Sequence, residues 1–166
     1  MFEKRPVQIT LAVICFLAPF LFYPRGDAEK AAWVWTRGAF PRERVTGLSS
    51  GGQGDGVIRY AAVAGRGVYR NTDDFHYWAF KSQGLPTGTL GRIDVYALAA
   101  SQENPRVVYA AVDNGRYGGG IYRTVNGGAS WVLVDRALAG RGRGVALAQG
   151  NEDIIYAAVE GKVVRS

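Results

Sequence analysis

The most constraining feature of this sequence is a four-residue motif that occurs three times. The motif "YAAV" stands at residues 60–63, 109–112 and 156–159, so that its tyrosines are 49 and 47 residues apart. A period of about 50 residues is too long for a leucine-rich repeat. It suits a unit of several short strands that is repeated along the chain.

The second unit shows how such a repeat is built. Strand-like segments stand at residues 95–100, 107–112, 120–124 and 130–134, separated by turn-rich stretches such as "SQENPR". A meander of four short antiparallel strands with this period is typical of a β-propeller blade. The 23 glycines among 166 residues also favour short strands joined by turns. We therefore expect an all-β fold, a propeller-like array of about three four-stranded antiparallel blades.

The third unit is shorter than the others. It holds strand-like segments at residues 144–149, 154–159 and 162–166, whereas residues 32–40, "AWVWTRGAF", resemble a lone outermost strand. The two could complete one another, because closing the last blade with an N-terminal strand hides an exposed edge. Three blades are fewer than the four to eight of a usual ring. We favour a fragment of a longer propeller over two copies that pair as half-rings.

The N-terminal part of the chain has the pattern of a targeting segment. Two basic residues precede residues 7–23, which are almost entirely apolar. This pattern predicts that residues 1–28 form a signal peptide or a membrane-anchor helix, and that residues 29–166, the partial propeller, lie outside the cytoplasm. The length of the apolar run fits either alternative. We favour cleavage after Ala28, which would make the protein secreted.

One hairpin of the second unit carries a distinctive set of turn residues. In the run "TVNGGASW" these are Thr124, Asn126, Gly128, Ser130 and Trp131. An asparagine at a turn accepts hydrogen bonds from backbone N–H groups, glycine permits a positive φ, and a hydroxyl can bond back across the loop. Tryptophan then covers the hairpin with apolar surface. The residue types therefore predict a structural role.

This set resembles the Asp-box, or BNR repeat, whose usual form is Ser/Thr-x-Asp-x-Gly-x-Thr/Ser-Trp. A degenerate copy, "NTDDFHYW", stands in the first unit and keeps Asp73 and Trp78. It has Asn71, Phe75 and Tyr77 where hydroxyl, glycine and hydroxyl residues are usual. We therefore expect the turn of this copy to be distorted.

The resemblance covers residues 33–166 and implies a β-propeller of the kind found in sialidases, xyloglucan-degrading glycosidases, sortilin-type receptors and photosystem assembly factors. In those proteins the boxes lie on the outer hairpins of the blades, away from the central funnel where ligands bind. The resemblance thus implies a structural role for Asp73, Trp78, Thr124, Asn126, Gly128, Ser130 and Trp131.

Little in the sequence points to catalysis. The acidic residues Asp55, Asp94, Asp113 and Glu160 show no spacing that would pair two carboxylates across a glycosidic bond. The single histidine, His76, lies in the degenerate box. We predict no catalytic residues, no cofactor and no metal site.

A candidate contact loop is present in the second unit. Its middle hairpin has four more residues than that of the first unit, and they fall in the run "NGRYGGG". Arg116 and Tyr117 in this glycine-rich excursion could contact a ligand at one rim of the molecule. The alternative is a merely flexible hairpin tip.

Net charge gives a weaker indication of partners. The formal charge of +6 comes from scattered arginines, which argues against nucleic-acid binding. We therefore expect an exported, non-catalytic binding or assembly module for a protein or carbohydrate ligand, which could act as a homodimer. One alternative is a fragment of a sialidase-like or xyloglucanase-like glycoside hydrolase. The other is a membrane-anchored assembly factor whose arginine-lined face holds an acidic partner.

Overall fold

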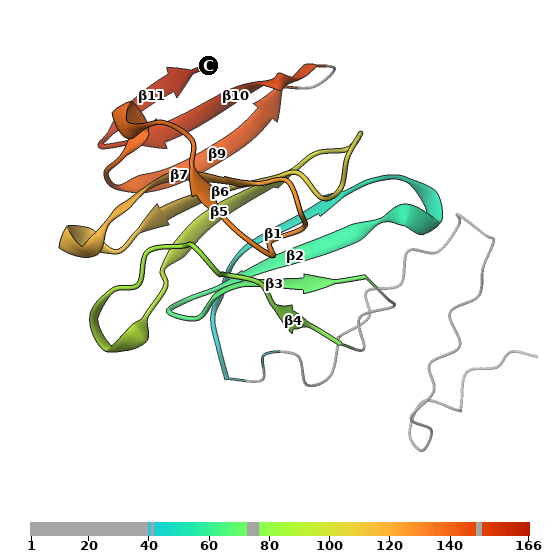
Figure 1. Cartoon of the computed structure of the whole chain (residues 1–166), viewed down its shortest axis with the longest axis horizontal. Helices are drawn as coiled ribbons and strands as arrows, with labels where there is room; N and C mark the ends of the chain where they lie inside the picture. The colour runs from blue at the N-terminus through green and yellow to red at the C-terminus, as the bar shows by residue number, and fades with distance from the viewer. Residues whose placement is uncertain (1–39, 41, 73–76, 149–150) are drawn as a thin grey trace, which may run out of the picture. The chain divides into compact units, whose positions relative to one another are not determined.

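The computed structural model describes residues 40, 42–72, 77–148 and 151–166 (Figure 1). The described residues form three antiparallel sheets, of four, four and three strands. The first sheet contains β1 (Val45–Gly51), β2 (Ile58–Val63), β3 (Gly67–Asn71) and β4 (Ala79–Phe80). The second contains β5 (Val95–Ala100), β6 (Val108–Asp113), β7 (Gly119–Thr124) and β8 (Val132–Leu133). The third contains β9 (Gly142–Ala148), β10 (Asn151–Val159) and β11 (Lys162–Arg165).

This architecture confirms the predicted fold class, an all-β, propeller-like array of three blades. Each sheet is a meander in which strands that are consecutive in the sequence are neighbours. The helical segments of the described part are single 3-10 turns, at Gly54–Gly56, Thr89–Gly91, Gly115–Tyr117 and Arg136–Leu138. The anchor helix expected within residues 1–28 lies outside the described residues.

The register shows that the three sheets are copies of one unit. In each sheet the "YAAV" motif lies on the second strand, and its tyrosine stands opposite an arginine of the third strand. These pairs are Tyr60 with Arg70, Tyr109 with Arg123, and Tyr156 with Arg165. We call the face that carries this tyrosine the tyrosine face, and the opposite face, which carries the alanine that follows it, the alanine face.

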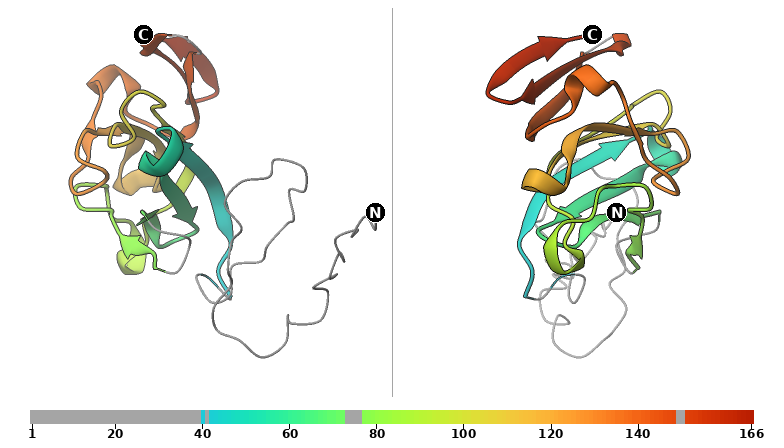
Figure 2. Two further views of the ribbon diagram at one scale, coloured as in Figure 1. Left: turned by 90° about the vertical axis from the view of Figure 1, so that its right-hand side faces the viewer. Right: turned by 60° about the vertical axis from the view of Figure 1, so that its left-hand side comes forward.

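The core lies between successive sheets, which are stacked in chain order (Figure 2). Tyr60 and Ala110 belong to one buried cluster, and Tyr109 and Ala157 belong to the next. The tyrosine face of the first sheet therefore packs on the alanine face of the second, and the tyrosine face of the second packs on the alanine face of the third. Because the second sheet is covered on both faces, all residues of β6 are buried.

Few of the residues before β1 can be placed in this framework. Phe40, the last residue of the segment that was expected to close the third sheet, packs on the first sheet. Its ring centroid lies 5.0 Å from that of Tyr69 and 5.6 Å from that of Trp78. Residues 32–39 lie outside the described residues. Within the described ranges, no helix is both long and apolar enough to cross a membrane.

Candidate functional site

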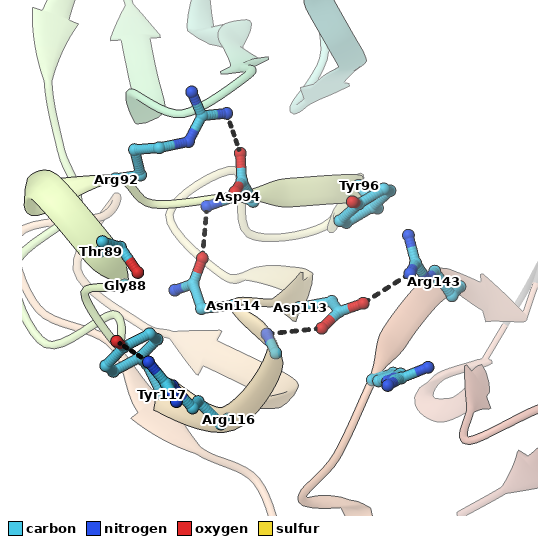
Figure 3. Close-up of a pocket in the computed structure, with 12 residues that line it drawn as sticks. Gly88, Thr89, Arg92, Asp94, Tyr96, Asp113, Asn114, Arg116, Tyr117 and Arg143 are labelled. Atoms are coloured by element: carbon cyan, nitrogen blue, oxygen red, sulfur yellow. Dashed lines mark hydrogen bonds and ion pairs between the residues drawn. The ribbon is translucent and has the colours of Figure 1, made fainter.

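A polar pocket of about 470 Å³ lies at the rim of the second and third sheets (Figure 3). Three segments form it: the loop before β5, the loop between β6 and β7, and the start of β9. Its charged residues are Arg92, Arg116, Arg141, Arg143, Asp94 and Asp113. The start of β5 and the end of β6 lie at the same end of the second sheet because Val95 pairs with Val112.

Asp113 organises the pocket. Its side chain is buried at the end of β6, and its Oδ1 accepts a hydrogen bond from the backbone N–H of Gly115 at 2.8 Å. The other oxygen, Oδ2, lies 2.6 Å from Nη2 of Arg143 in an ion pair. A buried carboxylate requires such partners, because water no longer solvates its charge. Asp113 thus shapes its own loop and ties it to the third sheet.

Arg143 is held from two sides. Besides its ion pair with Asp113, its guanidinium lies 4.1 Å from the ring centroid of Tyr96 on β5. This stacking and the ion pair together fix a planar group whose side chain is still about half exposed, at 49%. Arg143 therefore presents an oriented cation to the pocket, as Figure 3 shows.

Asn114 joins two of the loops that line the pocket. Its Oδ1 accepts a hydrogen bond from the backbone N–H of Asp94 at 2.8 Å, and its Nδ2 donates to the carbonyl of Pro86. The carboxylate of Asp94 pairs with Nη2 of Arg92 at 3.1 Å. The loop before β5 is thus positioned by a buried side chain of the neighbouring loop.

The predicted contact loop forms one side of the pocket. Nη2 of Arg116 donates to the hydroxyl of Tyr117 at 2.9 Å, and the guanidinium lies 5.0 Å from the same ring. Hydrogen bonding with Thr89, and to a smaller extent with Arg116, lowers the pKa of the Tyr117 hydroxyl. Both side chains are exposed, so they are accessible to a ligand. A ligand contact by this loop stays a prediction.

The pocket has an excess of positive charge. Arg92 and Arg143 have carboxylate partners, whereas no acidic side chain in the described part of the chain forms an ion pair with Arg116 or Arg141. Two guanidinium groups of the pocket therefore have no ion-pair partner among the described residues, although the carboxylate of Glu160 accepts the backbone N–H of Arg141 at 2.8 Å. Oriented guanidinium groups bind carboxylate and phosphate groups well, since their N–H donors match two oxygens at once.

Five of the other predicted residues lie elsewhere, at the turn between β7 and β8. The hydroxyl of Thr124 donates to Oδ1 of Asn126 at 2.8 Å and accepts the backbone N–H of Gly128 at 3.0 Å. Asn126 in turn accepts the backbone N–H of Ser130 at 3.0 Å and donates to its hydroxyl at 2.9 Å. Gly128 has a φ of +83°, which disfavours other residues. These hydrogen bonds between its own side chains and backbone close the turn.

Trp131 follows this turn and is buried between the first and second sheets. Its indole Nε1 donates to the carbonyl of Lys81 at 2.8 Å, and its backbone N–H donates to the carbonyl of Gln83 at 2.9 Å. In the degenerate copy, Trp78 is partly buried beside Phe40. Asp73 lies outside the described residues.

The sequence analysis singled out Arg116 and Tyr117, which line this pocket, but did not group the other lining residues with them. Arg143 and Asp113 are 30 positions apart and belong to different units. The repeat itself could have revealed the pocket. The starts of β5 and β9 occupy the same place in successive units, so the residues before them meet at one rim. In the described part of the chain, no group of three or more His, Cys, Asp or Glu residues could hold a metal ion.

Comparisons with known proteins show a distant likeness in structure and none in sequence. No family model matches the chain, and no curated protein is significantly similar to its sequence. Among solved structures, a chain described as "YCF48 bound to D1 peptide" is similar, with a TM-score of 0.49 and 14% sequence identity. The match covers 75% of this chain and 38% of that one. This chain therefore spans less than two fifths of that protein's length.

Proposed function

We propose that this chain is a non-catalytic binding module that holds a partner protein by an acidic group in the rim pocket. The observation that carries this proposal is that the guanidinium groups of Arg116 and Arg141, beside the fixed cation of Arg143, form no ion pair with any described carboxylate. An acidic side chain or a chain terminus of the partner supplies the missing negative charge. The pocket volume is within the usual range of about 300–1,000 Å³ for ligand sites.

The residues that line the pocket favour a protein segment as the ligand. Its walls combine arginines with two exposed tyrosines, Tyr96 and Tyr117. Tyrosine and arginine are enriched at protein interfaces, because both offer broad apolar contact together with hydrogen bonds. A segment with a carboxylate next to apolar side chains meets both requirements of this pocket.

The carboxylates of the pocket favour binding over glycoside hydrolysis. A glycoside hydrolase needs two carboxyl groups available to the scissile bond. Here Asp113 is buried against Arg143, and Asp94 is paired with Arg92. We therefore rank the glycoside hydrolase fragment below the binding module.

The other sequence-based expectations complete this proposal. We propose that the turn at residues 124–131 is an Asp-box that stabilises the blade, a role supported by its closed set of hydrogen bonds. We also propose that the propeller acts outside the cytoplasm, where residues 1–28 would direct it. If that segment is retained, the same pocket makes the chain a membrane-anchored assembly factor for an acidic partner.

Fluorescence anisotropy with labelled peptides tests the function. The probe is a hexaglutamate peptide with a free C-terminal carboxylate, and the reference is a hexaglutamine peptide with an amidated end. We expect the acidic peptide alone to bind, with an affinity that falls as salt is raised. Arg116→Gln and Arg141→Gln should each weaken binding by about tenfold, because each removes a charge-assisted hydrogen-bond donor.

Arg136→Gln is the matched control, because Arg136 is also exposed but does not line the pocket. It should bind the acidic peptide as the unmodified chain does. Equal binding of the two peptides would contradict the proposal. So would a loss of affinity that is the same in the control and in the pocket variants.

A further inference from the structure

Two residues other than glycine have a positive φ in the described part of the chain. They are Leu90, at +57°, and Glu160, at +50°, and each is followed by a glycine with a φ of +74°. Two successive positive φ values are typical of a type I′ turn, whose first central residue is usually asparagine, aspartate or glycine. Leucine and glutamate both strain the backbone in this conformation.

The side chain of Glu160 compensates for this strain within the chain. Its Oε1 accepts a hydrogen bond from the backbone N–H of Arg141 at 2.8 Å. The same side chain packs against Gly140. The glutamate therefore connects its own turn to the segment before β9, which the turn's preferred residues would not do.

Leu90 gains no comparable burial. Its turn is closed by the backbone N–H of Arg92, which donates to the carbonyl of Thr89 at 3.3 Å. The leucine side chain itself is 95% exposed. It therefore adds almost no apolar burial to the fold, although asparagine would suit the turn better. Strain without burial in the fold favours a contact outside the chain.

The turn that carries Leu90 borders the rim pocket. Thr89 and Arg92, which begin and end the turn, both line that pocket (Figure 3). The hydroxyl of Thr89 also hydrogen-bonds with that of Tyr117, an exposed aromatic residue of the opposite loop. A leucine side chain and an aromatic ring therefore stand next to the arginines of the pocket.

We infer that Leu90 is a specificity-determining contact, which packs on an aliphatic side chain of the partner next to its acidic group. This inference rests on the function proposed above and names the chemistry of the partner, an acidic segment with aliphatic residues beside its carboxylates. The arginines select for negative charge, and Leu90 selects among acidic segments. The strained turn exchanges some stability of the fold for this contact.

Fluorescence anisotropy with two labelled octapeptides tests this inference. Both peptides contain six glutamates and a free C-terminal carboxylate, and their two central residues are leucines in one and serines in the other. We expect the full chain to bind the leucine peptide about tenfold more tightly, because Leu90 buries apolar surface only with that peptide. Leu90→Asn should abolish this preference and should bind the serine peptide as the unmodified chain does.

The melting temperature separates a binding role from a structural one. Leu90→Asn relieves the backbone strain, so it should raise the melting temperature by about 2 °C. Glu160→Asn is the matched control for this measurement. It relieves the same strain but removes the hydrogen bond with Arg141, so it should not raise the melting temperature. A fall in the melting temperature of Leu90→Asn would show that Leu90 serves the fold, and would overturn the inference.

Two further variants control the peptide measurement. Leu90→Met keeps an apolar side chain and should keep the preference for the leucine peptide. Val163→Asn replaces another exposed apolar residue, which does not line the pocket, and should keep the preference as well.

The outcomes distinguish this inference from the function on which it rests. Equal affinity of the unmodified chain for the two peptides would overturn the role of Leu90 alone. So would a preference that Leu90→Asn retains. If neither peptide binds, the inference and the proposed function are both wrong.

Discussion

The two contacts between successive sheets are built from different interactions. The contact between the first and second sheets contains twelve buried residues in one cluster, whereas the contact between the second and third contains six. By area burial alone the first contact should contribute more to stability. Two neutral hydrogen bonds cross it: the hydroxyl of Tyr60 donates to the carbonyl of Pro105 at 2.7 Å, and that of Thr46 to the carbonyl of Val95 at 2.6 Å. The guanidinium of Arg70 also donates across it, to the carbonyl of Gly127 at 3.3 Å.

The contact between the second and third sheets depends more on charge. The carboxylate of Glu152 on β10 accepts hydrogen bonds from the hydroxyl of Ser101 and from the backbone N–H groups of Gln102 and Glu103. The ion pair between Arg143 and Asp113 joins the same two sheets. Hydrogen bonds and an ion pair of charged side chains thus accompany the smaller apolar core between the second and third sheets.

The difference in apolar burial between the two contacts follows from the outermost hairpin of the second sheet. Trp131 belongs to the second sheet but seals the contact with the first. In the described part of the third sheet there is no fourth strand to bring an equivalent tryptophan. A groove of about 500 Å³ lies at that place, between the exposed valines of the β8 region and Ile155. The outer hairpin of the second unit therefore completes the core of that unit's contact with the first.

The largest effect should come from removing the residue that seals the first contact. Trp131→Ala should lower the free energy of unfolding by about 3–5 kcal/mol, because it leaves a cavity between two sheets and the carbonyl of Lys81 loses its donor. Urea denaturation of the full chain measures this loss. Val132→Ala is the control, since Val132 is the exposed neighbour on β8, and it should change stability by less than about 0.5 kcal/mol. A melting curve that Trp131→Ala leaves unchanged would contradict the described packing.

The sequence predicted the second unit well because its strands obey local rules. Residues 95–100 were predicted as a strand and form β5 with the same bounds. The outermost strand was predicted at residues 130–134, but β8 comprises only Val132 and Leu133. Ser130 is used by the turn, where its backbone N–H bonds Asn126 instead of a neighbouring strand. A side-chain network therefore shortens the strand, which strand propensity alone does not reveal.

The rim pocket was harder to predict, for a different reason. Its residues come from two units, and their proximity depends on how sheets stack rather than on any local pattern. Asp113 and Arg143 each looked like a scattered surface charge in the sequence. The stacking makes one of them buried and orients the other. Charges that meet across a contact between repeats become recognisable only when the units are superimposed.

A smaller effect, with a distinctive pH dependence, is expected at the second contact. Burial alone would raise the pKa of Glu152, but hydrogen bonds from Ser101, Gln102 and Glu103 outweigh this effect and lower it below the ordinary 4.5. A carboxylate with a lowered folded pKa stabilises the fold above its unfolded pKa, and this contribution is lost as the pH falls through the folded value. Glu152→Gln should therefore cost about 1 kcal/mol at pH 7.

The pH dependence distinguishes this ionic tie from a packing effect. The difference between Glu152→Gln and the unmodified chain should shrink below pH 4.5 and vanish once Glu152 is protonated. The cost of Trp131→Ala should not follow that titration, because no titrating group takes part in the indole contact. Chemical denaturation at a series of pH values gives both curves. A Glu152→Gln cost that persists at the lowest pH would assign the effect to shape and not to charge.

The smallest expected effect concerns the stacking that orients Arg143. Tyr96→Leu removes the aromatic face beneath the guanidinium but leaves the ion pair with Asp113 in place. We expect a loss of about 0.5–1 kcal/mol in stability, typical of an exposed cation–π contact. If Arg143 must be held rigid to bind an anion, affinity for the hexaglutamate peptide should fall as well, because an unrestrained side chain loses more entropy on binding.

Tyr77→Leu, at an exposed tyrosine outside the pocket, is the control and should change neither the stability nor the peptide affinity. A stability loss without any change in peptide affinity would show that the stacking serves only the contact between the second and third sheets.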